Sequence, residues 1–278
     1  MPLAIYPATR YVVPLREGGS LPAVLDTEGG LFVVKFRGAG QGARALTAEL
    51  IGGGLAERLG LPMPEVALID LDEGFGRTER DPEIQDILKG SRGLNVGLRY
   101  LERAHAYDPV AMADFVTPEL AADLVWFDAL ITNIDRTPRN PNLLIWDRSL
   151  WLIDHGAALY FHHNWDVVDA ERARAPFPPI KDHVLLPAAG DLQAADERLA
   201  PLLTPAVVRE VLAAIPDALL QDAPPGQAPP FATAAENRAA YQAYVEARLQ
   251  SPRAFVAEAQ AAQQRLADAP TQALRYRR

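Results

Sequence analysis

Cysteine is absent from this chain of 278 residues, which excludes disulfides, thiolate catalysis and cysteine-ligated zinc sites. Long apolar runs are absent too, since none approaches the roughly 18 residues that a membrane-spanning helix needs. The first fifteen residues lack a basic segment followed by an unbroken apolar core, so they do not resemble a secretory signal peptide. We therefore expect a cytoplasmic protein without a membrane partner.

Positive charge is in deficit, because 27 Lys and Arg residues face 36 Asp and Glu residues and leave a net charge of −9. This balance disfavours a general nucleic-acid-binding role, which usually shows a basic excess. A polyanion such as ATP would have to be held locally, by a metal ion and a few placed cations. Lysine is the scarcer cation, with only Lys35, Lys89 and Lys181 in the chain, so a lysine inside an apolar strand calls for a specific explanation.

The first third of the chain has the pattern of strands with one long helix. Short strands are predicted over 10–36, with a hairpin turn at Gly29-Gly30. Apolar residues at helical spacing predict a helix over 43–59. Its glycines 52–54 are poor helix interior residues, so the helix either packs very closely against a neighbour or is distorted. Further strands are predicted at 65–71 and 93–101, separated by a polar stretch with a short helix.

The rest of the chain is predicted to be mainly helical. Thr117-Pro118-Glu119 has the pattern of a capped helix start, and the helix reaches about Thr132. A polar loop over 133–142 leads into a hairpin over 143–153, and a loop then continues to about residue 195. Three later helices are predicted at 204–215, 235–249 and 252–268.

Strands first and helices later predict an α+β fold rather than a doubly wound sheet. We expect a small nucleotide-binding lobe at 1–101 and a larger helical lobe, with the hairpin, at 102–278. The content of 49% hydrophobic and 23% charged residues is ordinary for a globular chain that can bury a sizeable core.

Lys35 lies inside the apolar segment LFVVKF. An unpaired ammonium group in such a place is costly, so it needs a partner or an anion. Glu49, on the next predicted helix, is the obvious partner, and we predict an ion pair between them. A lysine on an edge strand with its head group in solvent is the alternative interpretation.

Two aspartates stand at the ends of predicted elements. Asp135 follows a helix and opens the loop DRTPRNPN, whereas Asp154 closes an apolar strand before His155-Gly156. Taken separately, each has a structural alternative, which is a polar turn for Asp135 and a turn cap for Asp154. Together with Lys35 and Glu49 they follow the order in which kinases supply a phosphate-binding lysine, its glutamate, a catalytic loop and a metal-binding turn.

Two asparagines compete for the place of a metal ligand beside Asp154. The kinase spacing D-x-x-x-x-N, counted from Asp135, selects Asn140, whereas the position directly before the apolar strand selects Asn142. We favour Asn142, with Asn140 shaping the turn, because the hairpin that carries Asp154 fixes where a ligand can point.

The segments FVVKF, RALTAEL, GLPMP, NIDRTPRNPNLLI and WLIDHGAALYFHH resemble the HipA-like kinases, which are distant relatives of protein kinases and phosphatidylinositol kinases. The resemblance implies a bilobal protein-kinase-like fold that uses ATP and Mg²⁺. It implies that Lys35 contacts the α/β-phosphates with Glu49 holding it, that Asp135 is the catalytic aspartate, and that Asp154 ligates Mg²⁺. Serine or threonine of an unidentified protein is the implied acceptor. The alternatives are a small-molecule kinase and a catalytically silent pseudokinase scaffold.

The segment REGGS separates two predicted strands, and we expect Gly19 and Ser20 to lie in a phosphate-facing loop. The resemblance also implies that Ser20 is a site of autophosphorylation. A turn serine without a regulatory role is the alternative. No GxGxxG or Walker sequence supports the assignment.

Overall fold

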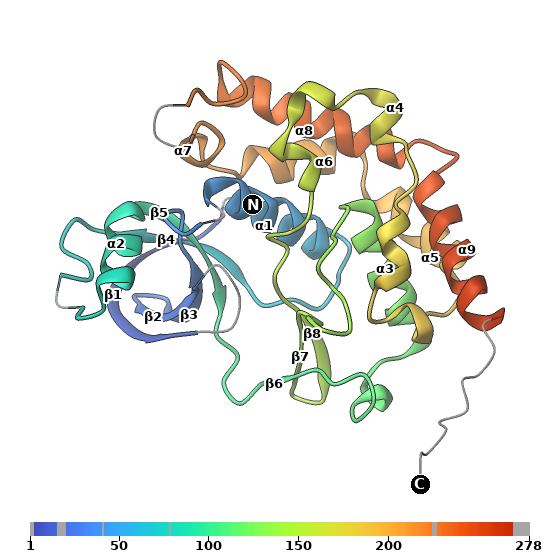
Figure 1. Ribbon diagram of the computed structural model, residues 1–278, viewed down its shortest axis with the longest axis horizontal. Helices are drawn as coiled ribbons and strands as arrows, with labels where there is room; N and C mark the ends of the chain where they lie inside the picture. Colours follow the sequence, from blue (N-terminus) through green and yellow to red (C-terminus); the bar gives the residue numbers. More distant parts are fainter. Residues whose placement is uncertain (1–2, 16–20, 41, 78, 224–226, 269–278) are drawn as a thin grey trace, which may run out of the picture.

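The structure is a computed structural model that describes residues 3–15, 21–40, 42–77, 79–223 and 227–268. The N-terminal part is rich in strands and the C-terminal part is helical, as the order of elements predicts. Figure 1 shows strands β1 to β5 on the left, most helices at the top and right, and the long helix α1 (Gly42–Arg58) between them, with β6 to β8 below α1. Gly19 and Ser20 lie outside the described residues, so their predicted roles are not addressed.

Five strands close into a barrel in the order β1-β2-β3-β5-β4. Parallel pairing of Ile5–Pro7 on β1 with Leu68–Asp70 on β4 closes it, and β1 therefore starts before the residue 10 that the sequence pattern predicts. The strands are β1 (Ile5–Pro14), β2 (Ala23–Thr27), β3 (Gly30–Lys35), β4 (Val66–Leu71) and β5 (Gly93–Arg99). The short helix α2 (Pro82–Gly90) connects β4 to β5, within the polar stretch where a short helix is expected.

The barrel interior is filled by alternate residues of its strands. Phe32 and Val34 of β3 and Ile69 of β4 are fully buried members of the barrel's own core. Successive side chains of a strand point to opposite faces. Lys35, next to Val34, is therefore directed out of the barrel, to the side on which α1 lies.

Helix α1 (Gly42–Arg58) runs without interruption through its three glycines and packs against β5, α6 and α7. A Cβ atom on Gly52 would lie 2.7 Å from Cβ of His155, and one on Gly54 would lie 2.6 Å from Cγ1 of Val211. A Cβ on Gly53 would lie 3.0 Å from Cγ2 of Val66. Close packing on three sides, rather than distortion, is thus the reason for the glycines.

The chain enters its helical part through β6 (His105–Ala106), which pairs with β7 (Leu143–Trp146). Strand β8 (Ser149–Leu152) completes this three-stranded sheet and forms the predicted hairpin with β7. Between β6 and β7 in the sequence lies α3 (Pro118–Leu130). It begins at the predicted cap Thr117, whose side chain accepts a hydrogen bond from the Leu120 amide.

The helices that follow form the remainder of the core with α1 and α3. The segment from 155 to 195, predicted as a loop, contains several short helical turns. Its 3₁₀ turns are Tyr160–His163, Trp165–Val167, Pro178–Asp182 and Leu186–Ala188; two more are Ala113–Phe115 and Ala200–Leu202. The α-helices are α4 (Ala170–Ala173), α5 (Leu192–Leu199), α6 (Pro205–Ala213), α7 (Asp217–Leu220), α8 (Ala234–Leu249) and α9 (Ala254–Asp268). Among the described residues, no helix combines the length and the apolar character needed to cross a bilayer.

Candidate active site

Lys35 and Glu49 form the ion pair that the sequence predicts. Lys35 Nζ lies 2.7 Å from Glu49 Oε2, and the Glu49 carboxylate is fully buried. Strand β3 ends at Lys35 and directs it toward α1, whose third turn carries Glu49. The alternative of a lysine head group in open solvent is wrong, because the Lys35 side chain is only 10% exposed.

Asp154 is the second carboxylate in contact with Lys35. Its Oδ1 atom lies 2.5 Å from Lys35 Nζ and also accepts a hydrogen bond of 3.1 Å from the Gly156 amide. The backbone amide of His155 donates to Glu49 Oε2 over 2.9 Å. The turn after β8 thus contacts both members of the ion pair, and we call Lys35, Glu49 and Asp154 the Lys35 cluster.

The proton equilibria in this cluster favour the charged forms. Burial acts to lower the pKa of Lys35, but Glu49 and Asp154 outweigh it, so the pKa of Lys35 is raised. Burial acts to raise the pKa of Glu49, but Lys35 and the hydrogen bond from His155 hold that pKa far below its usual range. Lys35 therefore stays a full cation in a largely buried place.

Asp135 lies beside both candidate asparagines. Asn140 Nδ2 donates to Asp135 Oδ2 over 2.7 Å, and Asn142 Nδ2 donates to the same oxygen over 3.3 Å. Partial burial and the negative charge of nearby Asp154 raise the pKa of Asp135, although the hydrogen bonds from the asparagines oppose them. Both amide side chains face Asp135, and the preference for Asn142 as a metal ligand stays a prediction.

A second charged cluster joins the loop over 133–142 to α3, and the sequence patterns do not predict it. Arg136 Nε lies 2.5 Å from Asp128 Oδ2, and His183 Nε2 lies 2.9 Å from the same oxygen. We call Asp128, Arg136 and His183 the Arg136 cluster. The side chains of Asp128 and Arg136 are both 0% exposed. One signal was available: Asp128 is a charged residue in the otherwise apolar run that α3 buries.

The side chains around Asp135 and Asp154 have the chemistry of a magnesium site. Carboxylate and amide oxygens are hard ligands of the kind that Mg²⁺ prefers, and Mg²⁺ is commonly bound by one or two carboxylates together with substrate phosphates. Within the part of the chain that the structure describes, no group of three or more acidic or histidine side chains could hold a metal without such help. The residues therefore fit a Mg²⁺ ion that is bound together with a nucleotide.

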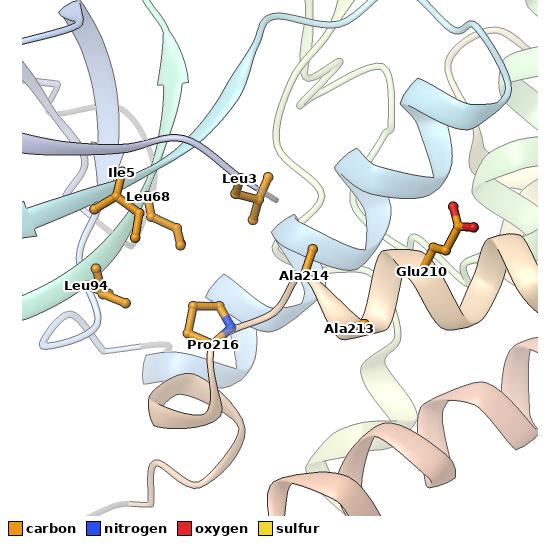
Figure 2. Close-up of a pocket in the computed structure, with 8 residues that line it drawn as sticks. All are labelled: Leu3, Ile5, Leu68, Leu94, Glu210, Ala213, Ala214 and Pro216. Atoms are coloured by element: carbon orange, nitrogen blue, oxygen red, sulfur yellow. The ribbon is translucent and has the colours of Figure 1, made fainter. Parts of the chain in front are cut away.

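Two surface hollows lie away from these residues. One, of about 510 Å³, lies between the outer face of the barrel and the end of α6 (Figure 2). It is lined mostly by apolar residues, among them Leu3, Ile5, Leu68 and Leu94 from the barrel side and Pro216 from the helical side. The other, of about 470 Å³, lies against β1 and the loop after β4. Neither is lined by a predicted site residue.

Comparisons with known proteins show the fold and the family of the chain. The chain is similar to the solved structure of a Helicobacter pylori proinflammatory kinase, CtkA, with a TM-score of 0.51 and 11% sequence identity, over 97% of this chain and 100% of that one. This likeness shows a shared fold. A family model described as HipA-like kinase matches residues 17–187. The chain belongs to the HipA-like kinase family, as its motifs indicate. A search among curated proteins finds no match.

Proposed function

We propose that this chain is an ATP- and Mg²⁺-dependent kinase with two lobes, divided near residue 101, that transfers a phosphoryl group to a serine or threonine hydroxyl. The observation that carries the proposal is the convergence of Lys35, Glu49 and Asp154, from β3, α1 and the turn after β8, within hydrogen-bonding distance. Asp135 lies close enough for the charge of Asp154 to raise its pKa. Membership of a kinase family supports the same chemistry.

Lys35 is suited to hold the phosphates of a nucleotide. Its ammonium group is charged, fixed by Glu49 and directed toward Asp154. Phosphoryl transfer is accelerated mainly by positioning and by charge stabilisation, which a rigidly held cation supplies without reorganisation. A bound Mg²⁺ would supply positive charge that stabilises the negative charge developing during phosphoryl transfer. Asp154 and Asn142 would hold that ion.

Asp135 is suited to accept the proton of the acceptor hydroxyl. Its carboxylate is oriented by Asn140 and Asn142, and its backbone amide donates to Asn133 Oδ1 over 3.1 Å. The raised pKa makes this carboxylate a stronger base than an ordinary aspartate. Its role would be to orient the hydroxyl and to take its proton.

The test compares two of the three lysines. Lys35→Met should abolish Mg²⁺-dependent consumption of labelled ATP and weaken the thermal stabilisation of the protein by MgATP. Lys89→Met is the matched control, because Lys89 lies on the surface and pairs with neighbouring Asp86 on α2. A parent protein that is stabilised by MgATP but consumes none of it, with or without added serine- and threonine-containing protein, would be a pseudokinase. Consumption with small hydroxyl compounds alone would favour the small-molecule kinase.

A further inference from the structure

Two residues proposed to face the metal ion share an unusual backbone conformation. Asn142, directly before β7, has a φ of 49°, and Asp154, shortly after β8, has a φ of 59°. Both lie in the left-handed region, which is sterically unfavourable for a residue with a side chain, although Asn and Asp adopt it more readily than most. Such conformations persist only where the surrounding structure determines them. Contacts that hold the backbone of both residues are therefore expected.

Arg136 contacts the backbone at both places. Its Nη1 atom donates to the carbonyl oxygen of Asn142 and, over 3.0 Å, to the carbonyl oxygen of Ile153, the residue before Asp154. The amide of Ile153 in turn donates to the Asn142 carbonyl over 3.1 Å. One guanidinium group thus joins the two ends of the hairpin at the two left-handed residues.

The guanidinium group is itself held by the Asp128 carboxylate. Asp128 of α3 binds its Nε atom, and the same carboxylate accepts a hydrogen bond of 3.0 Å from Asn133, two residues before Asp135. His183 Nδ1 accepts from the Leu185 amide over 3.1 Å, so its Nε2 carries the proton and donates to Asp128. Two neighbouring segments therefore fix the orientation of Asp128, and through it that of Arg136.

We propose that Arg136 is a positioning residue, which holds Asn142 and Asp154 in left-handed conformations so that their side chains face Asp135 and Lys35, with Asp128 and His183 fixing the guanidinium. The idea deepens the proposed function, since it concerns the same site. Its first consequence, however, is a backbone property that exists without nucleotide or metal.

The test uses Arg136→Lys, which keeps the charge but loses the planar group that reaches both carbonyls. Amide hydrogen exchange in the nucleotide-free protein should speed up at Ile153, His155 and Gly156, whose amides are hydrogen-bonded in this turn. Mn²⁺ affinity in the presence of a non-hydrolysable ATP analogue, followed by electron paramagnetic resonance, should weaken about 10- to 100-fold, as for other residues that orient metal ligands. If Arg136→Lys does not fold, His183→Gln should show the same changes to a smaller extent.

Asp196→Asn provides the matched control. Asp196 of α5 is also buried and binds a charged partner, Arg253, together with the indole of Trp126 on α3. Its substitution should lower the melting temperature without altering exchange in the turn or Mn²⁺ affinity. Unchanged exchange at Ile153–Gly156 in a folded Arg136→Lys variant would overturn the positioning role. A parent protein that binds neither the nucleotide nor Mn²⁺ would refute the proposed function, while the exchange measurement would still decide the positioning role.

Discussion

The Lys35 cluster holds its cation with two carboxylates and the Arg136 cluster with one, and the two clusters differ in access to solvent. The Asp154 side chain is 35% exposed, whereas both members of the Arg136–Asp128 pair are sealed from water. A charge at an open edge can take up a ligand, because the ligand replaces water rather than a protein partner. A charge that is sealed from water cannot take up a ligand, so its interactions serve only to hold the surrounding chain in place.

The two clusters also differ in what they join. The Lys35 cluster connects side chains from β3, α1 and the turn after β8, which are distant from one another in the sequence. The Arg136 cluster connects a side chain to backbone carbonyls at the ends of one hairpin. We infer a division of labour, in which one cluster contacts ligands and the other sets the geometry of the residues that do.

The largest expected effect is on catalysis, at Asp135 beside the more exposed Lys35 cluster. Asp135→Ala should reduce phosphoryl transfer by on the order of 10²–10⁴, the usual contribution of a positioned acid–base group. Nucleotide affinity should be largely retained, because Lys35 and Asp154 are untouched. Steady-state kinetics with direct measurement of nucleotide binding separates the two effects. Turnover equal to that of the parent would show that the proposed active site is assigned wrongly.

The free energy of unfolding should depend more on the buried Arg136 cluster than on the Lys35 cluster. Asp128→Ala leaves the Arg136 guanidinium buried without its carboxylate, and removal of one partner of a buried pair typically costs about 3–5 kcal/mol. Glu49→Gln should cost less, because Lys35 keeps Asp154 as a counter-ion and lies near the open edge. Chemical denaturation of both variants measures the difference. An equal or larger loss in Glu49→Gln would contradict the contrast between sealed and open clusters.

Local patterns could predict the Lys35 cluster but not the Arg136 cluster. Lys35 in an apolar strand and Glu49 on the following helix are prominent because each breaks an apolar run. Asp128 finds its partners Arg136 and His183 only after the chain has folded, and His183 comes from a segment that the sequence patterns assign to a loop.

The same limit applies to the fold. The strands of the hairpins were predictable, whereas barrel closure depends on pairing of β1 with the distant β4. The glycines of α1 signalled either close packing or distortion. Only the tertiary neighbours His155 and Val211 decide between these alternatives.

The pH dependence of stability should distinguish Asp135 from the clustered carboxylates. The pKa values of Glu49 and Asp128 are lowered in the folded state, so each stabilises the fold above its unfolded pKa of about 4. That stabilisation is lost as the pH falls below this value. The pKa of Asp135 is raised, so its ionisation opposes folding as the pH rises from about 4 through the raised value.

The variant Asp135→Asn should therefore melt at a slightly higher temperature than the parent at pH 7. The two should converge below about pH 4, where the carboxyl group is protonated in both states. Thermal unfolding across this range provides the measurement. A variant that is less stable than the parent at pH 7 would show that the charge of Asp135 is compensated within the fold.

The smallest expected effect separates the two asparagines. Both donate to Asp135 Oδ2, but Asn142 is joined through its own carbonyl to Arg136 and to Ile153, whereas Asn140 sits in a turn closed by hydrogen bonds with Thr137. The backbone of Asn142 is thus fixed to the hairpin that carries Asp154, and that of Asn140 is fixed to a local turn. Asn142→Ala should raise the Mg²⁺ concentration required for half-maximal activity by more than Asn140→Ala does. Mg²⁺ titration of both variants at saturating ATP decides the question, and a larger shift in Asn140→Ala would assign the ligand to Asn140 without disturbing the kinase assignment.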